Sequence, residues 1–332
     1  MFLLSRLLNR RTSCLGVHID INAVRLIEIS WRQGRYRVEG ISYLPLEAGV
    51  IEPSGKIVKM EPLVYALRLA KEAAHGSASC VATAVPGSCV ITKTVQMMAS
   101  LSKVDREAQA WVEAGNCFPY ALKELMLDFF VLGPSSGNAE KMDVLLVAVH
   151  AEDVQPRIDA LSEAGIKPNI VDADYFVLAH ACKCILENNN ISVDEVIACT
   201  YISESSVKLI VFHKLRMIYT REINFENGST TTEGQSFVGS LQEMLATHTR
   251  RTIDFFYSAS EVTTIKVILL SGASSALEGL PALVEKATGI HTIMANPFLG
   301  MDFGKNVNRE DVMKEAPNLL VACGLALRGI RL

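Results

Sequence analysis

The stretch LGVHIDINAVRLIEI, residues 15–29, decides the fold. Its first half alternates apolar residues with His18, Asp20 and Asn22, and a period of two is typical of a half-buried strand. The apolar residues after Asn22 continue as a second strand, and the Gln33-Gly34 pair supplies a turn into a third. The sequence therefore predicts an antiparallel meander whose first strand carries its polar side chains on one face.

The chain contains the same order of elements twice. The first set has strands at 15–21, 24–30 and 36–43, a helix at 62–74 and a strand at 79–85; the second has strands at 196–201, 207–212 and 217–223, a helix from about 236 to 256 and a strand at 266–270. The segment VRLI at 24–27 aligns with VKLI at 207–210 at an offset of 183 residues. In this register His18 overlies Tyr201, Asp20 overlies Ser203 and Asn22 overlies Ser205.

An insertion interrupts the first set. Strands at 90–96, 126–132 and 143–149 with a helix at 104–117 predict a small α+β subdomain. The first half resumes with a helix at 153–164, a strand at 169–172 and a helix that Asp174 caps. We therefore divide the chain into an N-terminal amphipathic segment (1–11), a first half (12–87 and 151–190), the insertion (88–150) and a second half with a shortened cap (191–332).

The composition excludes several classes of protein. Hydrophobic residues make up 49% of the 332 residues and charged residues 20%, so a disordered chain and a disulfide-held mini-protein are excluded. A net charge of −4 gives no basic footprint for nucleic acid. No apolar run approaches the roughly 18 residues of a membrane span, and the N-terminus lacks the order of a secretory signal. We therefore expect a cytosolic protein with reduced cysteines.

Seven segments carry a more specific signal: LGVHIDINAVRLIEI, SCVITKTVQM, FPY at 118–120, LDFFVLGP, MIYTREI, ANPF at 295–298 and APNLLVACGLALR. Together they resemble the PilM family, FtsA-like cytoplasmic proteins of type IV pilus assembly. The resemblance extends from Leu15 to Arg328, and the cytoplasmic part of GspL is a more distant relative. It implies an α/β fold of duplicated actin/FtsA-like (ribonuclease H-like) βββαβα halves with an inserted α+β subdomain.

The resemblance also implies a location and partners. PilM-like proteins are cytoplasmic and dock at the inner face of the bacterial inner membrane by binding the N-terminal tail of PilN. Other proteins of the pilus inner-membrane platform, and a second copy of the chain as a homo-oligomer, are further expected partners. The groove for the tail lies where the insertion meets the first half.

The superfamily further implies a nucleotide site between the halves, where two glycine-containing hairpins, each opening with an aspartate, hold the phosphates of ATP. Here Gly16 keeps its position, but His18 and Tyr201 replace the aspartates. Ser203 stands where a glycine belongs, and in the turn expected at adenosine Gly272 is followed by Ala273. These departures predict a degenerate site that binds ATP and Mg weakly or not at all.

Alternatives stay open at this site. A shifted register makes Asp20 the carboxylate and Asn22 the turn residue, which retains a weak ATP site. In the opposite alternative, Asp20, Asn22, Ser203 and Ser205 only satisfy their own turn backbones. We nominate no catalytic residue and no metal site. The leading hypothesis is a non-catalytic scaffold of pilus assembly; an actin-like ATPase is the alternative, and a small-molecule kinase ranks last.

Two segments are candidates for contact with partners. The apolar strands of the insertion must pack on something, and an extended peptide can add to such an edge. The candidate groove residues are Val90, Thr92, Thr94, Gln96, Phe129 and Phe130. The segment MFLLSRLLNRR at 1–11 combines an apolar helical face with three arginines, which suits an anionic membrane surface or a neighbouring subunit, although a frayed terminus is an equal alternative.

Overall fold

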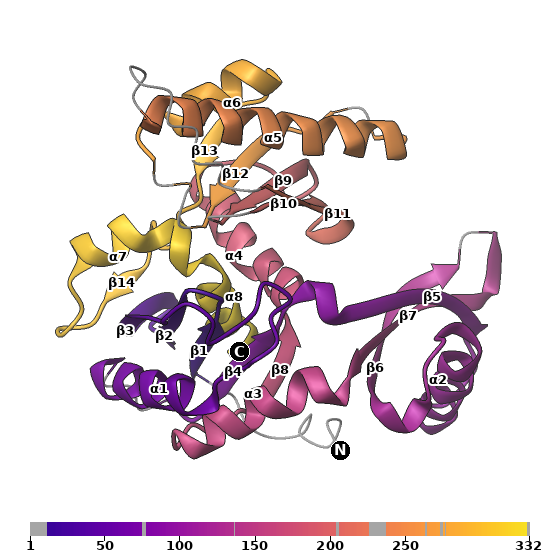
Figure 1. The fold of residues 1–332 in the computed structure, drawn as a ribbon. Coiled ribbons are helices and arrows are strands. Elements are labelled where there is room, and N and C mark those ends of the chain that lie inside the picture. Colours follow the sequence, from indigo (N-terminus) through magenta and orange to yellow (C-terminus); the bar gives the residue numbers. More distant parts are fainter. Residues whose placement is uncertain are drawn as a thin grey trace.

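The computed structural model describes residues 12–74, 78–135, 137–203, 206–225, 237–262, 264–272, 275 and 277–330. It contains two halves stacked one above the other and an insertion that projects from the side of the first half (Figure 1). None of the helices within these ranges is long and apolar enough to cross a membrane. The N-terminal segment 1–11 lies outside the described residues.

The sheet of the first half has six strands: β14 (Asp302–Phe303), β3 (Arg35–Pro45), β2 (Ala23–Arg32), β1 (Ser13–Ile19), β4 (Val81–Val85) and β8 (Ile170–Ala173), in that order. β1, β2 and β3 pair antiparallel, as the meander predicts, and the other pairs are parallel. Gln33 and Gly34 turn between β2 and β3 with φ of 51° and 83°. Two successive residues with positive φ give the turn that matches strand twist.

Helices cover both faces of this sheet. α1 (Met60–Ala74) and α3 (Ala151–Glu163) pack on the face that carries Val17 and Leu26. The opposite face, with Ile27 and Ile29, is covered by α8 (Leu320–Gly329), after the short helices α7 (Arg309–Glu315) and η4 (Ala316–Leu319). The expectation of a half-buried first strand is therefore wrong: β1 is buried from Cys14 to Ile19, because both its faces are covered.

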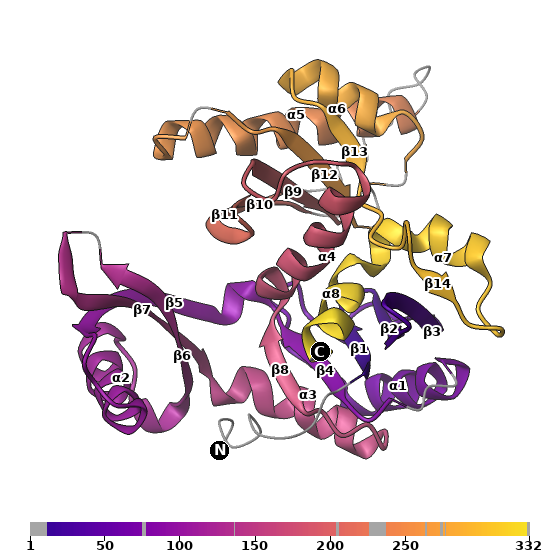
Figure 2. The same ribbon diagram turned by 180° about the vertical axis from the view of Figure 1, so that it is seen from behind.

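The insertion is a three-stranded antiparallel sheet in the order β5 (Val90–Met98), β7 (Asn138–His150) and β6 (Leu125–Ser135). Helix α2 (Lys103–Cys117) covers one face, where Ala110 and Ala114 meet Leu146 and Val144. Two single-turn helices, η1 (Gly87–Cys89) and η2 (Leu122–Glu124), lead into β5 and β6. Figure 2 shows this sheet standing apart from both halves except at its junction with β4 and α3.

The second half repeats the plan. Its sheet has the order β11 (Arg216–Asn224), β10 (Ser206–His213), β9 (Val196–Ile202), β12 (Val267–Ser271) and β13 (Thr292–Met294). One face packs on α5 (Phe237–Ala259) and α6 (Leu280–Thr288). The other face packs on α4 (Asp174–Asn188), which also contacts α8 of the first half. Helix α4 therefore lies between the two sheets (Figure 1).

The two hairpins share one register. Arg25 pairs with His18 across β2 and β1, and Lys208 pairs with Tyr201 across β10 and β9. The 183-residue offset read from the sequence thus holds in three dimensions. Residues at equivalent positions of the two hairpins occupy equivalent places in the two sheets.

Two features differ from the sequence-based expectations. The C-terminal residues assigned to the second half return to the first: β14 pairs with β3, and α8 packs on β1 and β2. Asp174 does not cap α4, because the N-cap residue is Ala173 and no side chain caps the helix. The Asp174 carboxylate instead accepts a hydrogen bond from the backbone N–H of Gly87 at 3.0 Å.

Candidate functional site

The two equivalent hairpins meet between the halves through side chains. The hydroxyl of Tyr201 on β9 donates to Oδ2 of Asp20, at the end of β1, with an oxygen–oxygen distance of 2.7 Å. Nη1 of Arg25 on β2 donates to the same oxygen at 3.0 Å. Oδ1 of Asp20 accepts the backbone N–H of Ile21 at 2.8 Å. The Asp20 carboxylate therefore accepts hydrogen bonds from its own turn and from both hairpins.

The charges in this cluster follow from burial and contact. Burial would raise the pKa of Asp20, but His18, Arg25 and the Tyr201 hydroxyl hold it below the ordinary value. Burial lowers the pKa of His18 to about 4, so its ring is neutral near pH 7 and Arg25 supplies the positive charge. Burial and the nearby Asp20 raise the pKa of Tyr201, which keeps its proton for the hydrogen bond.

A second polar link joins the halves beside the first. Nζ of Lys208 lies 3.6 Å from Oδ2 of Asp174 on α4 and 3.5 Å from a carboxylate oxygen of Glu222 on β11. Oδ1 of Asp174 holds the N–H of Gly87, the first residue of η1, which leads into the insertion. Asp174 therefore contacts the second half through one oxygen and the start of the insertion through the other.

The glycines predicted for phosphate binding have packing roles. A Cβ at Gly16 would lie 2.0 Å from the carbonyl oxygen of Ala322 on α8 and 2.7 Å from the N of Ala326. At Gly272 φ is +91°, and a Cβ would lie 2.3 Å from the carbonyl oxygen of Ile202. In both places backbone atoms occupy the space that a side chain would take. The lack of a side chain therefore allows the backbone to pack closely there.

The remaining predicted residues of the nucleotide site hold turns. The backbone N–H of Ser203 donates to the carbonyl of Ser206 at 2.9 Å, and its hydroxyl accepts the N–H of Ser206 at 2.9 Å. The carbonyl of Asn22 accepts the N–H of Leu46 at 2.8 Å. Ser205 and Ala273 lie outside the described residues. The Ser203 hydroxyl thus bonds within its own turn, whereas the Asp20 carboxylate also binds Tyr201 and Arg25.

The predicted groove residues divide between three environments. Thr92 and Thr94 are exposed on the open face of the insertion sheet, and Thr94 lies in one row with Leu145 and Phe130, whose side chain is 59% exposed. Phe129 points to the other face and packs under α2. Val90 packs into the junction with the first half, beside Val149 and Met126.

Gln96 lies at the outer end of the open face. Its amide donates to the hydroxyl of Ser135 on β6. At the inner end, Asp128 stands in the row of Thr92 and adds to the negative potential at Asp172 on β8. Burial raises the pKa of Asp172, and Arg328 of α8, whose Nε lies 3.0 Å from its carboxylate, opposes the rise. The open face thus carries an acidic residue near each end, Asp143 in the row of Gln96 and Asp128 in the row of Thr92.

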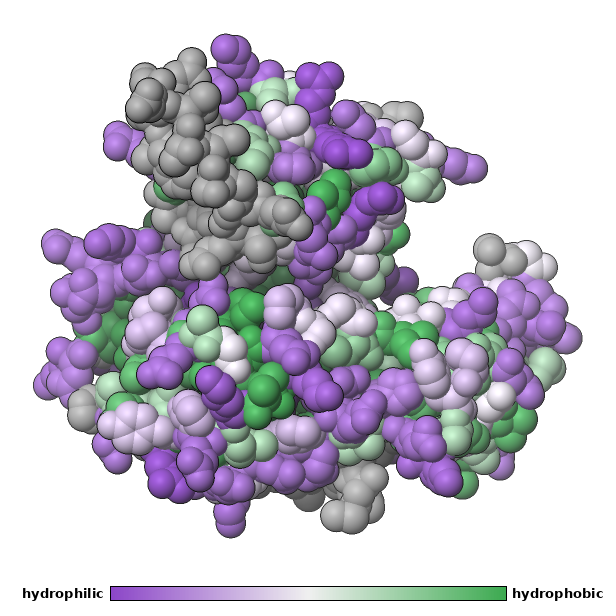
Figure 3. All heavy atoms as spheres, viewed as in Figure 1, coloured by the Kyte–Doolittle hydropathy of each residue, from purple (hydrophilic) through white to green (hydrophobic). Residues whose placement is uncertain are grey.

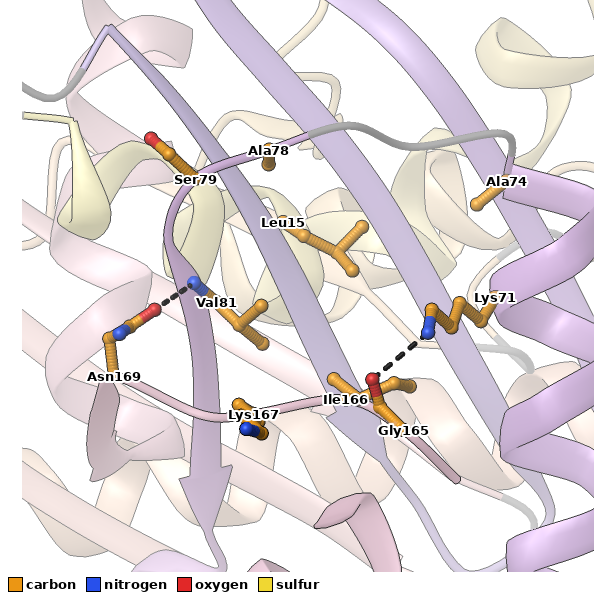
Figure 4. A pocket seen from close by; sticks show the side chains of 10 residues that line it. All are labelled: Leu15, Lys71, Ala74, Ala78, Ser79, Val81, Gly165, Ile166, Lys167 and Asn169. Carbon is orange, nitrogen blue, oxygen red and sulfur yellow. Dashed lines mark hydrogen bonds between the residues drawn. The ribbon is translucent and has the colours of Figure 1, made fainter. Parts of the chain in front are cut away.

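A cavity of about 340 Å³ lies at the other end of β1. Leu15, Val81 and Ile166 give it an apolar lining, and the ammonium of Lys71 donates to the carbonyl of Gly165 at 2.9 Å (Figure 4). The side-chain oxygen of Asn169, which also lines the cavity, accepts the N–H of Val81. The cavity begins at Leu15, three residues before His18 on β1, and is separate from the cluster between the halves.

Sequence reasoning missed the basic partners of this site. Arg25 and Lys208 sit at the same position of the two hairpins, opposite His18 and Tyr201. A basic residue at both equivalent positions of otherwise apolar strands was the signal that could have found them. Asp174 was read as a helix cap, and only the tertiary contacts reveal its two partners.

Comparison with known proteins assigns the family. The family model described as "Type IV pilus assembly protein PilM" matches residues 16–239 and 235–330. The chain belongs to the PilM family. Its predicted resemblance to that family is thereby confirmed over most of its length.

Solved structures support the fold of this PilM-family chain. A structure of a PilM-PilN type IV pilus biogenesis complex matches with a TM-score of 0.78 and 23% identity over 98% of this chain and 100% of that chain. The ethanolamine utilization protein EutJ from Carboxydothermus hydrogenoformans matches with a TM-score of 0.52 and 10% identity over 95% and 89%. At these identities the likeness shows the fold, and the expected α/β actin-like class is confirmed.

Proposed function

We propose that this chain is a non-catalytic scaffold of the type IV pilus inner-membrane platform that binds the N-terminal tail of PilN. Membership of the PilM family and similarity to a structure solved as a PilM-PilN complex support the partner. We place the protein in the cytoplasm at the inner face of the inner membrane, where such a tail would reach it. Other platform proteins and a second copy of the chain are further proposed partners.

The tail is proposed to bind on the open face of the insertion sheet. Within the part of the chain that the structure describes, no helix packs over that face, whereas α2 covers the opposite face. Thr92, Thr94 and Phe130 are exposed there, and β5 and β6 are both edge strands. An extended peptide that pairs with the edge of β5 can place alternate side chains beside the exposed Thr92 and Thr94. Figure 3 shows the surface hollowed between the second half and the insertion, which leaves access to β5.

The observation that carries the non-catalytic part is the direct hydrogen bond from Tyr201 to Asp20. A Mg-ATP site between the hairpins needs carboxylates free to orient the metal and cations free for the phosphates. The Asp20 carboxylate is already used by Tyr201 and Arg25, and Lys208 is shared by two carboxylates. The residues present therefore fit Mg-ATP poorly. The alternative, an actin-like ATPase coupled to pilus assembly, requires these pairs to break.

Calorimetry with a synthetic PilN N-terminal peptide tests the proposal. We expect binding by the full chain and a clear loss of affinity in Thr92→Arg and Thr94→Arg, which place a long cation on the open face. Thr220→Arg is the matched control, because Thr220 is exposed on β11 of the other half. Gln96 is left unchanged because of its bond to Ser135. Unchanged melting temperatures show that the variants fold, and full affinity in both insertion variants would place the groove elsewhere.

The same instrument tests the absence of a nucleotide. Titration of the protein with Mg-ATP should give no heat that fits a dissociation constant in the low micromolar range. A constant in that range or tighter would favour the ATPase alternative and refute the non-catalytic proposal.

A further inference from the structure

One side-chain triad spans the two halves of the molecule. It consists of Asp20 and Arg25 of the first hairpin and Tyr201 of the second, and is called the latch below. The three donor–acceptor distances are 2.7 Å from Tyr201, 3.0 Å from Arg25 and 2.8 Å from the N–H of Ile21. All four lone-pair directions of a carboxylate can accept such bonds, so the three donors do not compete for one position.

The surroundings shield most of the latch from water. Arg25 is 2% exposed, and the side chain of Asp20 is 22% exposed. A hydrogen bond to a charged group strengthens as the local dielectric falls. In this setting the Tyr201–Asp20 bond cannot exchange freely for water, and its loss would leave a carboxylate with fewer partners in a largely dry site.

Other polar contacts join the halves at other places, among them the hydrogen bond from the N–H of Gly272 to the carbonyl of Pro317 at 3.0 Å. The Lys208 side chain, which is 17% exposed, lies 3.6 Å from the carboxylate of Asp174. Helix α4 packs on both halves through apolar side chains, whose contacts are not directional. The latch is therefore a short, directional link between the two hairpin ends.

We propose that the latch fixes the spacing of the two halves without a ligand, taking the place of a molecule bound between the hairpins. The inference extends the proposed non-catalytic scaffold and rests on that function for the absence of nucleotide. A scaffold that binds its partner through the insertion gains from this arrangement, because the insertion joins the first half next to Gly87. Asp174 accepts the N–H of Gly87 and also contacts Lys208, the strand neighbour of Tyr201. Holding the halves fixed thus holds the base of the insertion.

Amide hydrogen exchange, followed by mass spectrometry on the full chain, measures opening at the latch. Tyr201→Phe removes only the hydroxyl. We expect exchange to become about 10- to 100-fold faster in peptides covering both hairpin ends, residues 17–23 and 199–203, as for loss of a hydrogen bond to a charged group. Tyr65→Phe is the matched control, because Tyr65 is 65% exposed and its variant should exchange like the wild type.

A second variant guards against misfolding. Asp20→Asn keeps the size of the side chain and removes the charge. Its effect on the exchange rate should be smaller when Tyr201→Phe is already present, because both substitutions act on the Tyr201–Asp20 hydrogen bond. If exchange in both hairpins stays at the wild-type rate in the two folded single variants, or if their effects add fully, the latch does not hold the halves. Protection of wild-type hairpins by added Mg-ATP would also overturn the inference, because a ligand would then occupy the place of the latch.

The PilN peptide separates this inference from the proposed function. Faster exchange in Tyr201→Phe together with no peptide binding by the wild type would support the latch and refute the partner. Peptide binding with unchanged exchange would support the partner and refute the latch.

Discussion

Substituting Gly16 by Ala tests whether this glycine serves a ligand or the packing of α8. The new Cβ would lie 2.0 Å from the carbonyl oxygen of Ala322 and 2.7 Å from the N of Ala326. Both obstacles are backbone atoms of a buried helix, so no side-chain tip can move aside. Overpacking of this kind costs about 1–3 kcal/mol, and the rigid obstacle places Gly16→Ala at or above the upper end.

The assay is urea unfolding of the full chain, with the melting temperature as a second readout. Gly115→Ala is the matched control, since its Cβ would meet only the tip of Leu122 at 3.4 Å. Gly115 lies in α2, where Ala is favoured over Gly by about 0.5–1 kcal/mol, so this control should be slightly stabilised. A Gly16→Ala variant with the wild-type urea midpoint would refute the packing argument. If such a variant also lost affinity for Mg-ATP, the glycine would be assigned to a ligand.

Three further predictions concern pH, charge and the N-terminus. Because burial lowers the pKa of His18 from 6.5 to about 4, the stability linked to its neutral ring is present above pH 6.5 and lost as the pH falls toward 4. His18→Asn should flatten that fall in the free energy of unfolding, measured with urea, by up to about 3 kcal/mol. Lys208→Met, which removes a largely buried cation between two carboxylates, should lower the unfolding free energy by about 1–2 kcal/mol, whereas Lys183→Met, 57% exposed, should leave it unchanged. Deleting residues 1–11 should reduce either flotation with anionic liposomes or oligomer size, and no change in both would leave a frayed terminus.

Much of the fold could be predicted because its elements are long and periodic. The meander, the insertion and the repeat each rest on runs of alternating or helical spacing, and the shared VRLI and VKLI segments fixed the 183-residue register that Arg25 and Lys208 keep in space. Strand β14 could not be predicted, because two residues carry no period. The packing of α8 on the first sheet is also determined by tertiary contacts, which a local sequence pattern does not show.

The positions of the site residues could be predicted from the sequence more readily than the contacts that these residues make. Alternation alone puts Phe129 and Phe130 on opposite faces of β6, but only the packing of α2 decides which face stays open. The polar residues of the first strand could be identified, yet the burial of β1 on its two faces depends on α1, α3 and α8, which come from distant parts of the chain. Asp174 shows the same limit: a helix start predicts a cap, and the competing N–H of Gly87 is 87 residues away.

The latch depends on asymmetry between two equivalent hairpins. In a duplicated fold, equivalent positions of the two halves face each other across the cleft, so like residues tend to meet like. Two aspartates that face each other repel and need a cation between them. Here Tyr201 stands at the position equivalent to His18, and its longer side chain reaches the carboxylate of Asp20. Ser203, the equivalent of Asp20, turns back to Ser206 and presents no second carboxylate. A hydroxyl that faces a carboxylate forms a hydrogen bond by itself, so the Tyr201–Asp20 contact needs no cation between its partners, unlike a symmetric pair of carboxylates.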